Sequence, residues 1–181
     1  MIARRILCLT TALAVLLLSL ALAACGSSEE DKDVSEGIPV ELGELQYNVL
    51  FSRILNPYDV EDREYLVGQA PPPADEVYFG VFVEVLNKDH ESPQTIPSGW
   101  TITDTERNEF QPLPSESPYA LRLGEAVGPE DQVPALDSSP QVGPIQGSMV
   151  LFLIPDDATE YRPLELTIPG EGGPAKVELD I

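Results

Sequence analysis

Cysteine and histidine are almost absent from this chain. Its 181 residues include two cysteines, Cys8 and Cys25, and one histidine, His90. Soft metal ions are bound by clusters of Cys and His, and a serine or cysteine nucleophile needs a general base, most often His. Redox chemistry, zinc chemistry and triad catalysis are therefore close to excluded. His90 lies in the polar segment 87–91 after a strong apolar run, which predicts an exposed loop around it.

Basic residues are also scarce. The chain holds 10 Lys and Arg against 31 Asp and Glu, a formal net charge of −21. A surface this acidic repels nucleic acid and anionic lipid headgroups, so no nucleic-acid partner is expected. A basic protein partner or a bound cation would suit the charge, although the charge requires neither and also serves solubility.

The motifs of common enzyme classes are missing as well. The sequence has no phosphate-binding loop and no dinucleotide-binding fingerprint. Gly147-Ser148-Met149 lacks the second glycine of a nucleophile elbow. The sequence therefore predicts no catalytic residue, no cofactor and no enzyme activity.

One long apolar run is present, at residues 6–24, and it carries no charge. Two arginines precede it and small residues end it, which is typical of a secretory signal peptide. Its end, Leu22-Ala23-Ala24-Cys25, resembles the bacterial lipobox, in which the cysteine receives a diacylglyceryl group and becomes the first residue of the mature chain. The resemblance implies a signal peptide over residues 1–24 and lipidation of Cys25.

Lipidation of Cys25 would anchor the protein in membrane lipid on the extracytoplasmic face of a bacterial cell. Two acyl chains suffice, because each buried methylene contributes about 0.8 kcal/mol and stable anchoring needs two such chains. Two alternatives stay open. The run could remain as a transmembrane helix, since about 20 apolar residues span a bilayer, or the protein could be secreted after cleavage near Ala24.

Removal of residues 1–24 leaves 157 residues, which suits one domain. Residues 25–43 begin with Cys25 and are small, polar and acidic up to Ile38, which predicts a flexible acidic tether. Residues 44–181 would then form the folded domain. That domain contains no cysteine, so its core must stabilise it without disulfides.

Hydrophobic residues recur with period two after residue 43, as in half-buried strands. Leu45, Tyr47, Val49 and Phe51 show the pattern. The near-continuous apolar run of residues 77–86 predicts a central strand, in which Gly80 would let another backbone or a large ring approach closely. Further strands are predicted at residues 100–104, from 110, and at 119–123, 148–154, 164–168 and 176–181. The mature chain has no amphipathic helix and at most one helical turn, at residues 155–158. Many short strands with Pro-rich connections favour an all-β sandwich or barrel of about seven to eight strands, and residues 124–145 are the best candidates for mobility.

Four segments resemble a family of uncharacterised bacterial lipoprotein domains with a telokin-like, immunoglobulin-like antiparallel β-sandwich. Residues 43–49 look like the first strand of that family. Residues 78–87 are similar to its central strand, which ends in Asn before a hairpin loop. Residues 100–110 resemble its next hairpin, and residues 147–155 its late strand, in which an apolar run reaches a proline. The resemblance covers most of residues 43–169. It implies an extracytoplasmic sandwich and no catalytic residues.

Acidic side chains gather at two places and are the candidate metal ligands. Asp59, Glu61 and Asp62, with Glu64, follow Asn56-Pro57, and Asp156-Asp157 form a second pair. Calcium takes six to eight oxygen ligands, often from such loops, but the spacing matches no EF-hand. The alternative is ordinary solvated loop charge.

Three functions are open at this point. The first is a lipid-anchored, non-catalytic binding module of the cell envelope with an envelope protein as partner. The second is a calcium-binding surface module that uses the acidic loops. The third is a hydrolase with paired carboxylates, which needs two of them facing each other across a cleft. Tyrosines in the acidic loops, at 58, 65 and 161, would either form a binding patch or pack beneath the loops.

Overall fold

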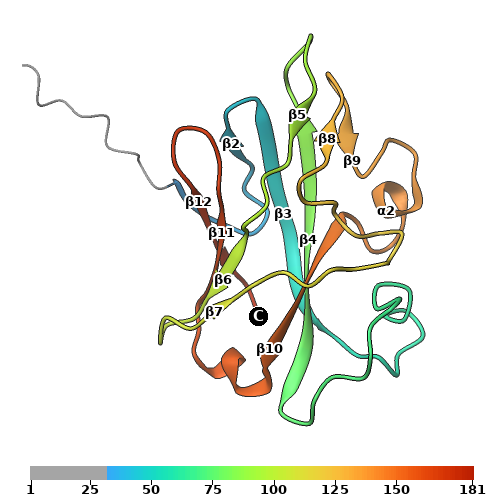
Figure 1. Ribbon diagram of the computed structural model, residues 1–181, viewed down its shortest axis with the longest axis vertical. Coiled ribbons are helices and arrows are strands. Elements are labelled where there is room, and N and C mark those ends of the chain that lie inside the picture. Colours follow the sequence, from blue (N-terminus) through green and yellow to red (C-terminus); the bar gives the residue numbers. More distant parts are fainter. Residues whose placement is uncertain (1–31) are drawn as a thin grey trace, which may run out of the picture.

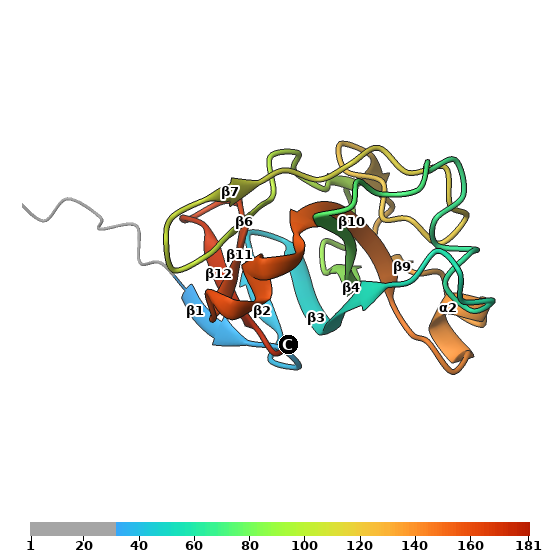
Figure 2. The same ribbon diagram turned by 90° about the horizontal axis from the view of Figure 1, so that it is seen from below.

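Two β-sheets packed face to face form the framework of residues 32–181, the part of the chain that this computed structural model describes (Figures 1 and 2). The long sheet consists of β2 (Val40–Leu42), β3 (Leu45–Leu55), β4 (Glu76–Asn87), β9 (Gln132–Val133) and β10 (Ser148–Pro155). The short sheet consists of β1 (Lys32–Ser35), β6 (Thr101–Thr103), β7 (Glu109–Phe110), β11 (Leu164–Ile168) and β12 (Ala175–Leu179). A two-stranded ribbon joins β5 (Gln94–Thr95) and β8 (Ala126–Val127).

The strand order is β10-β4-β3-β2 in the long sheet, with β9 also beside β4, and β1-β12-β11-β6-β7 in the short sheet. All pairs are antiparallel except β1 and β12. The predicted all-β sandwich is thus confirmed. Helical structure in residues 32–181 is confined to α2 (Ser139–Val142) and the 3-10 helix η2 (Asp156–Glu160), and no helix there is long and apolar enough to cross a membrane.

The main core lies between the two sheets and arises from the alternation in the strands. Its largest fully buried side chains include Trp100, Tyr47, Phe79 and Phe152. The rings of Tyr47 and Trp100 meet edge to face, with centroids 5.7 Å apart, and burial raises the pKa of Tyr47. Complete burial of a large apolar side chain contributes about 1.5–3 kcal/mol, so this core stabilises the domain without disulfides.

A β-bulge in β3 divides the outer face of the long sheet. The pairing of β3 with β4 shifts register between Val49 and Phe51. Before the bulge, Tyr47 and Val49 face the short sheet; after it, Leu55 belongs to a second apolar cluster on the outer face. The extra residue changes which alternate positions point inward, so one strand supplies both clusters.

The second cluster also contains Phe82, Met149 and Leu151, which are buried although they lie on the outer face of the sheet. Gly80 lies beside them, and of the two neighbours predicted for it, another backbone or a large ring, the structure shows the ring. A Cβ there would come within 3.1 Å of Leu55 Cδ1 and 3.2 Å of Phe82 Cε2. The missing side chain therefore lets a leucine and an aromatic ring pack over the backbone of β4.

The expectation of a flexible tether over residues 25–43 is wrong for its second half. Residues 32–35 form β1, which pairs in parallel with β12, and residues 40–42 form β2, which pairs with β3. Val40 and Leu42 are buried. Edge strands need only one hydrogen-bonded neighbour, and two buried side chains suffice to hold this polar segment on the sheet. Residues 1–31, with the predicted signal peptide and Cys25, lie outside the described residues.

Among the predicted strands only residues 119–123 do not form one. Ala120 makes an isolated bridge to Met149, and its N–H donates to Ser117 O at 3.2 Å, so the chain turns there. The helical turn predicted at residues 155–158 is confirmed as η2.

Residues 124–145, the candidates for mobility, carry β8, β9 and α2. Asn87 holds this region from the end of β4. It is fully buried, and its Nδ2 donates to the carbonyl oxygens of Val127 at 3.1 Å and Gly128 at 2.9 Å. A buried amide therefore ties the Pro-rich connection to the central strand.

Candidate binding loop

Residues 56–75 connect β3 to β4 without regular secondary structure, and we call them the β3–β4 loop (teal to green in Figure 1). Loops longer than about 12–15 residues in a compact domain are usually functional or disordered. This loop is attached to the sheet, because two of its side chains belong to the second apolar cluster.

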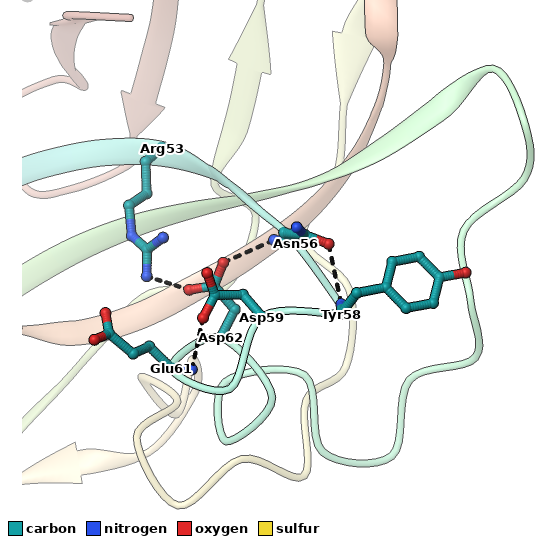
Figure 3. Close-up of polar contacts among 6 residues, drawn as sticks. All are labelled: Arg53, Asn56, Tyr58, Asp59, Glu61 and Asp62. Carbon is teal, nitrogen blue, oxygen red and sulfur yellow. Dashed lines mark hydrogen bonds and ion pairs between the residues drawn. The ribbon is translucent and has the colours of Figure 1, made fainter.

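Asp62 is the central anchor of the β3–β4 loop (Figure 3). Its carboxylate is buried and forms an ion pair with the guanidinium of Arg53 on β3. Its Oδ2 accepts a hydrogen bond from Asn56 N at 2.7 Å. The first residues of the loop are thereby folded back onto the strand that precedes them.

Arg53 connects this anchor to the sheet. Its Cζ lies 5.8 Å from the ring centroid of Phe82, within range of a cation–π interaction. The ring of Phe51 stacks on that of Phe82, with centroids 4.4 Å apart. Arg53 therefore binds Asp62 through its guanidinium group, which also lies over the ring of Phe82.

Tyr65 and Leu66 attach the middle of the loop to the outer face of the sheet. Both are buried. The ring of Tyr65 meets Phe82 edge to face at 5.3 Å and lies 5.2 Å from Tyr119. Burial raises the pKa of Tyr65, so its phenol stays neutral and packs as an apolar group.

A second loop fastens the β3–β4 loop from the other side. The hydroxyl of Ser117, which is fully buried, donates to Glu64 O at 2.7 Å, and the hydroxyl of Tyr119 donates to Glu64 Oε2 at 2.9 Å. This bond to a carboxylate raises the pKa of Tyr119. The anchors come from β3, β4 and the segment after β7, so the loop is positioned by a rigid scaffold.

The residues between these anchors face solvent. Tyr58 is 83% exposed, Val60 71% and Val67 42%. The close-up shows Tyr58 directed away from Asp62 and Arg53 (Figure 3). A small pocket of 230 Å³ opens beside this tyrosine and is lined by Pro57, Tyr58, Arg63, Leu66, Gln69, Ala70, Pro71 and Tyr78.

The predicted cation ligands of this loop have different environments. Asp62 is already bound by Arg53 and Asn56 N, so its carboxylate has a structural role. Asp59 and Glu61 are exposed, and Asp59 Oδ1 accepts a hydrogen bond from Glu61 N at 2.9 Å. Backbone N–H groups of the loop therefore already occupy some of the carboxylate oxygens that would have to bind a cation.

The second acidic pair, Asp156 and Asp157, lies in the first turn of η2. Within residues 32–181 no three His, Cys, Asp or Glu side chains are placed so that they could hold a metal ion. The structure thus does not combine these two aspartates with Asp59, Glu61 and Asp62 in one cluster. Calcium binding stays a hypothesis for experiment.

The tyrosines of the acidic loops have different environments. Tyr58 is exposed, Tyr65 packs beneath its loop, and Tyr161 is half-buried after η2. His90 lies on an exposed loop, as predicted, and its Nδ1 is 2.9 Å from Glu130 Oε1. The partnership of Arg53 and Asp62 was missed, because only the fold shows that residues nine positions apart meet.

Three carboxylates line one pocket on the outer face of the short sheet. Asp33, Glu165 and Glu178 line a pocket of 310 Å³ there, but Lys176 lies among them with its Nζ 3.4 Å from Glu165 Oε1. A carboxylate pair for glycoside hydrolysis must flank free space for the scissile bond. This pocket therefore does not favour the hydrolase hypothesis.

Comparison with known proteins supports the fold. No protein-family model and no curated protein sequence matches the chain. An uncharacterised β-sandwich protein from Clostridium difficile 630 is 13% identical, and the match covers 84% of this chain and 97% of that protein with a TM-score of 0.52. The yjhA protein from Bacillus subtilis is 15% identical over 81% of this chain and 99% of its own, with a TM-score of 0.56. At this identity the likeness concerns the β-sandwich alone.

Proposed function

We propose that this chain is a non-catalytic lipoprotein of the bacterial cell envelope. Acylated Cys25 would hold it on the extracytoplasmic face of the membrane, and its sandwich would bind another envelope protein through the β3–β4 loop. The membrane part of the proposal rests on the signal-peptide pattern and the lipobox resemblance at residues 22–25. The likeness to bacterial β-sandwich structures supports only the β-sandwich fold, and the binding role rests on the β3–β4 loop itself.

The observation that carries the binding role is a firmly anchored loop with exposed apolar side chains. Asp62, Tyr65 and Leu66 hold the loop on the sheet, while Tyr58 and Val60 stay in solvent. Because the loop is already ordered, a partner would not have to order it, and that saves binding free energy. Tyrosine is one of the residues that most often dominate interface energetics.

The charges around the loop indicate the kind of partner. Asp59, Glu61 and Glu64 are exposed in the same loop as Tyr58, with Arg63 as the single cation among residues 56–75. The whole chain has a formal net charge of −21. A protein with an apolar patch bordered by basic residues would complement this surface and associate rapidly at low salt.

The anchor is tested by cell fractionation of the full chain and two cysteine variants. Wild-type protein should be recovered with the membrane. The recovered wild-type protein should carry label from a radioactive fatty acid and lack residues 1–24. Cys25→Ser should carry no label, whereas Cys8→Ser is the matched control and should be labelled like the wild type. Unlabelled wild-type protein that retains residues 1–24 would contradict lipid anchoring and support a transmembrane helix.

The binding surface is tested by a photo-crosslinking amino acid placed at position 58 in living cells. The control carries the same amino acid at position 161, a tyrosine next to η2. One dominant adduct from position 58 and none from position 161 would support the proposal, especially if Val60→Asp abolishes that adduct. The same weak adducts from both positions, or no adduct at all, would refute it.

A further inference from the structure

Polar side chains gather on the other half of the long sheet's outer face, before the bulge in β3. Asn48 on β3 pairs in register with Glu84 on β4, and Gln46 pairs with Leu86. Leu86 in turn pairs with Gln132 on β9. The two inward neighbours in β3, Tyr47 and Val49, are buried in the main core, so these polar residues alternate outward.

These side chains line a pocket of 300 Å³, which we call the amide pocket. Gln141 of α2 and Pro39, which precedes β2, also line it, so three strands and a helix contribute to one cavity. Its five polar members are all half-buried: Gln46, Asn48, Glu84, Gln132 and Gln141. Such a side chain packs partly against the protein and is partly accessible to solvent.

Much of the hydrogen-bonding capacity of the amide pocket is unused. Gln46 and Gln132 donate through Nε2 to Glu41 Oε1 at 3.4 Å and to Pro134 O at 3.2 Å, which leaves their Oε1 atoms as acceptors. Gln141 accepts at Oε1 from Asp137 N at 3.2 Å, which leaves its Nε2 as a donor.

Asn48 is the most informative member of the pocket. Its Oδ1 is buried, yet no hydrogen-bond donor among residues 32–181 reaches it. A buried polar atom without a partner destabilises a protein, and each such atom in a folded domain needs a physical reason. Because this oxygen has almost no accessible surface, a ligand hydroxyl in the pocket would have to displace a covering group to reach it and supply that partner.

The chemistry of the lining selects the ligand class. Donors and acceptors lie side by side on one surface, which complements groups that both donate and accept, and hydroxyl groups do so. No Lys or Arg lines the pocket, and Glu84 is its one charged residue. An anionic ligand would therefore be repelled by the Glu84 carboxylate and find no cation. The volume is at the lower end of the range for small-molecule sites, about 300–1,000 Å³.

We propose that the amide pocket binds a neutral saccharide, one sugar unit in the cavity at a time. Pro39 and Leu86 provide the carbon surface against which the C–H face of a sugar ring would lie, and the amides pair with its hydroxyls. The pocket is formed by β3, β4, β9 and α2, not by the β3–β4 loop. Saccharide binding is therefore separate from the function proposed above and can hold or fail independently.

The test is saturation-transfer NMR on the full chain with glucose, maltose, N-acetylglucosamine and chitobiose. The detergent should carry polyoxyethylene headgroups, because sugar headgroups would compete. Asn48→Leu and Glu84→Gln should each weaken binding at least about fivefold, because ligand hydroxyls lose partners. Gln111→Leu, which changes an exposed amide after β7, is the matched control and should bind like the wild type.

Two further measurements complete the test: one separates a folding defect from lost binding, and the other tests the preference for a neutral ligand. The Asn48→Leu protein should melt no lower than the wild type, because the substitution removes an unpaired buried oxygen. Glucose 6-phosphate should bind more weakly than glucose because of Glu84. The proposal is overturned if none of the four saccharides binds saturably, if the phosphate ester binds better, or if the two pocket variants bind like the Gln111→Leu control.

Discussion

Removal of the Asp62 carboxylate should loosen the β3–β4 loop and destabilise the whole domain. In Asp62→Ala the guanidinium of Arg53 loses its ion pair, and Asn56 N loses its acceptor. The loop packs on the second apolar cluster through Tyr65 and Leu66. Because Asp62 lies between the strand and these two residues in the sequence, its loss weakens their placement as well.

The size of the effect follows from burial. Removing one partner of a fully buried ion pair costs about 3–5 kcal/mol. The side chain of Asp62 is only 4% exposed but that of Arg53 is 33% exposed, so water can solvate the freed guanidinium. We therefore expect a loss of about 2–3 kcal/mol in the free energy of unfolding. Asp59→Ala is the matched control, because exposed Asp59 accepts only one local hydrogen bond, from Glu61 N.

Urea unfolding of residues 32–181 measures the stability, and hydrogen exchange at the amides of Tyr65 and Leu66 measures loop opening. Asp62→Ala should accelerate exchange at both amides, whereas Asp59→Ala should not. In a double-mutant cycle with Arg53→Met, the coupling energy should reach about 1 kcal/mol or more. If Asp62→Ala costs no more than Asp59→Ala, the ion pair does not anchor the loop and our reasoning about a preordered binding surface is wrong.

Three other predictions concern the rest of the domain. Asn87→Ala should lower the free energy of unfolding, measured in urea, by about 2–4 kcal/mol, because three backbone carbonyls lose their donor. Asn87→Asp should destabilise the domain more, since it directs an acceptor toward these carbonyl oxygens. Equal stability of the Asp variant and the wild type would contradict this. Burial raises the pKa of Glu36, whose Oε1 accepts from Ser52 Oγ. The folded state therefore favours protonated Glu36, and this stabilisation is present below pH 4.5 and lost as the pH rises through the raised pKa. Glu36→Gln should consequently melt like the wild type in acid and higher at neutral pH, and a lower melting temperature at neutral pH would argue against it. Calcium should leave the melting temperature unchanged, because Arg53 and Asn56 N already bind Asp62; a rise would favour the cation-binding alternative.

Local patterns were sufficient for the strands that carry the core. The alternation from Leu45 onward predicts β3, and the apolar run of residues 77–86 predicts β4 within one residue at either end. Period-two burial is a property of a few consecutive residues, so it can be seen without knowledge of neighbours. The short strands β1 and β2 were not predicted, because their formation depends on neighbouring strands. They form because β12 and β3 offer open edges, and their own polar sequence does not indicate this.

The candidate site was predictable only in part. The acidic, tyrosine-containing loop after β3 was recognised, and its acidic residues were considered as calcium ligands or as solvated loop charge. Asp62 instead binds Arg53, and Tyr58 and Tyr65 have opposite environments although both lie in the same loop. The amide pocket was not anticipated at all, since Gln46, Glu84 and Gln132 are remote in sequence and come together only through strand pairing.

The sequence by itself determined the all-β class and a folded domain that holds no cysteine. Each of these follows from composition or from local periodicity. Only the tertiary structure decided that the bulge in β3 divides one face of the long sheet into an apolar half beneath the β3–β4 loop and a polar half at the amide pocket. Which residues cover a strand's outer face depends on contacts between distant segments, and no local pattern contains that information.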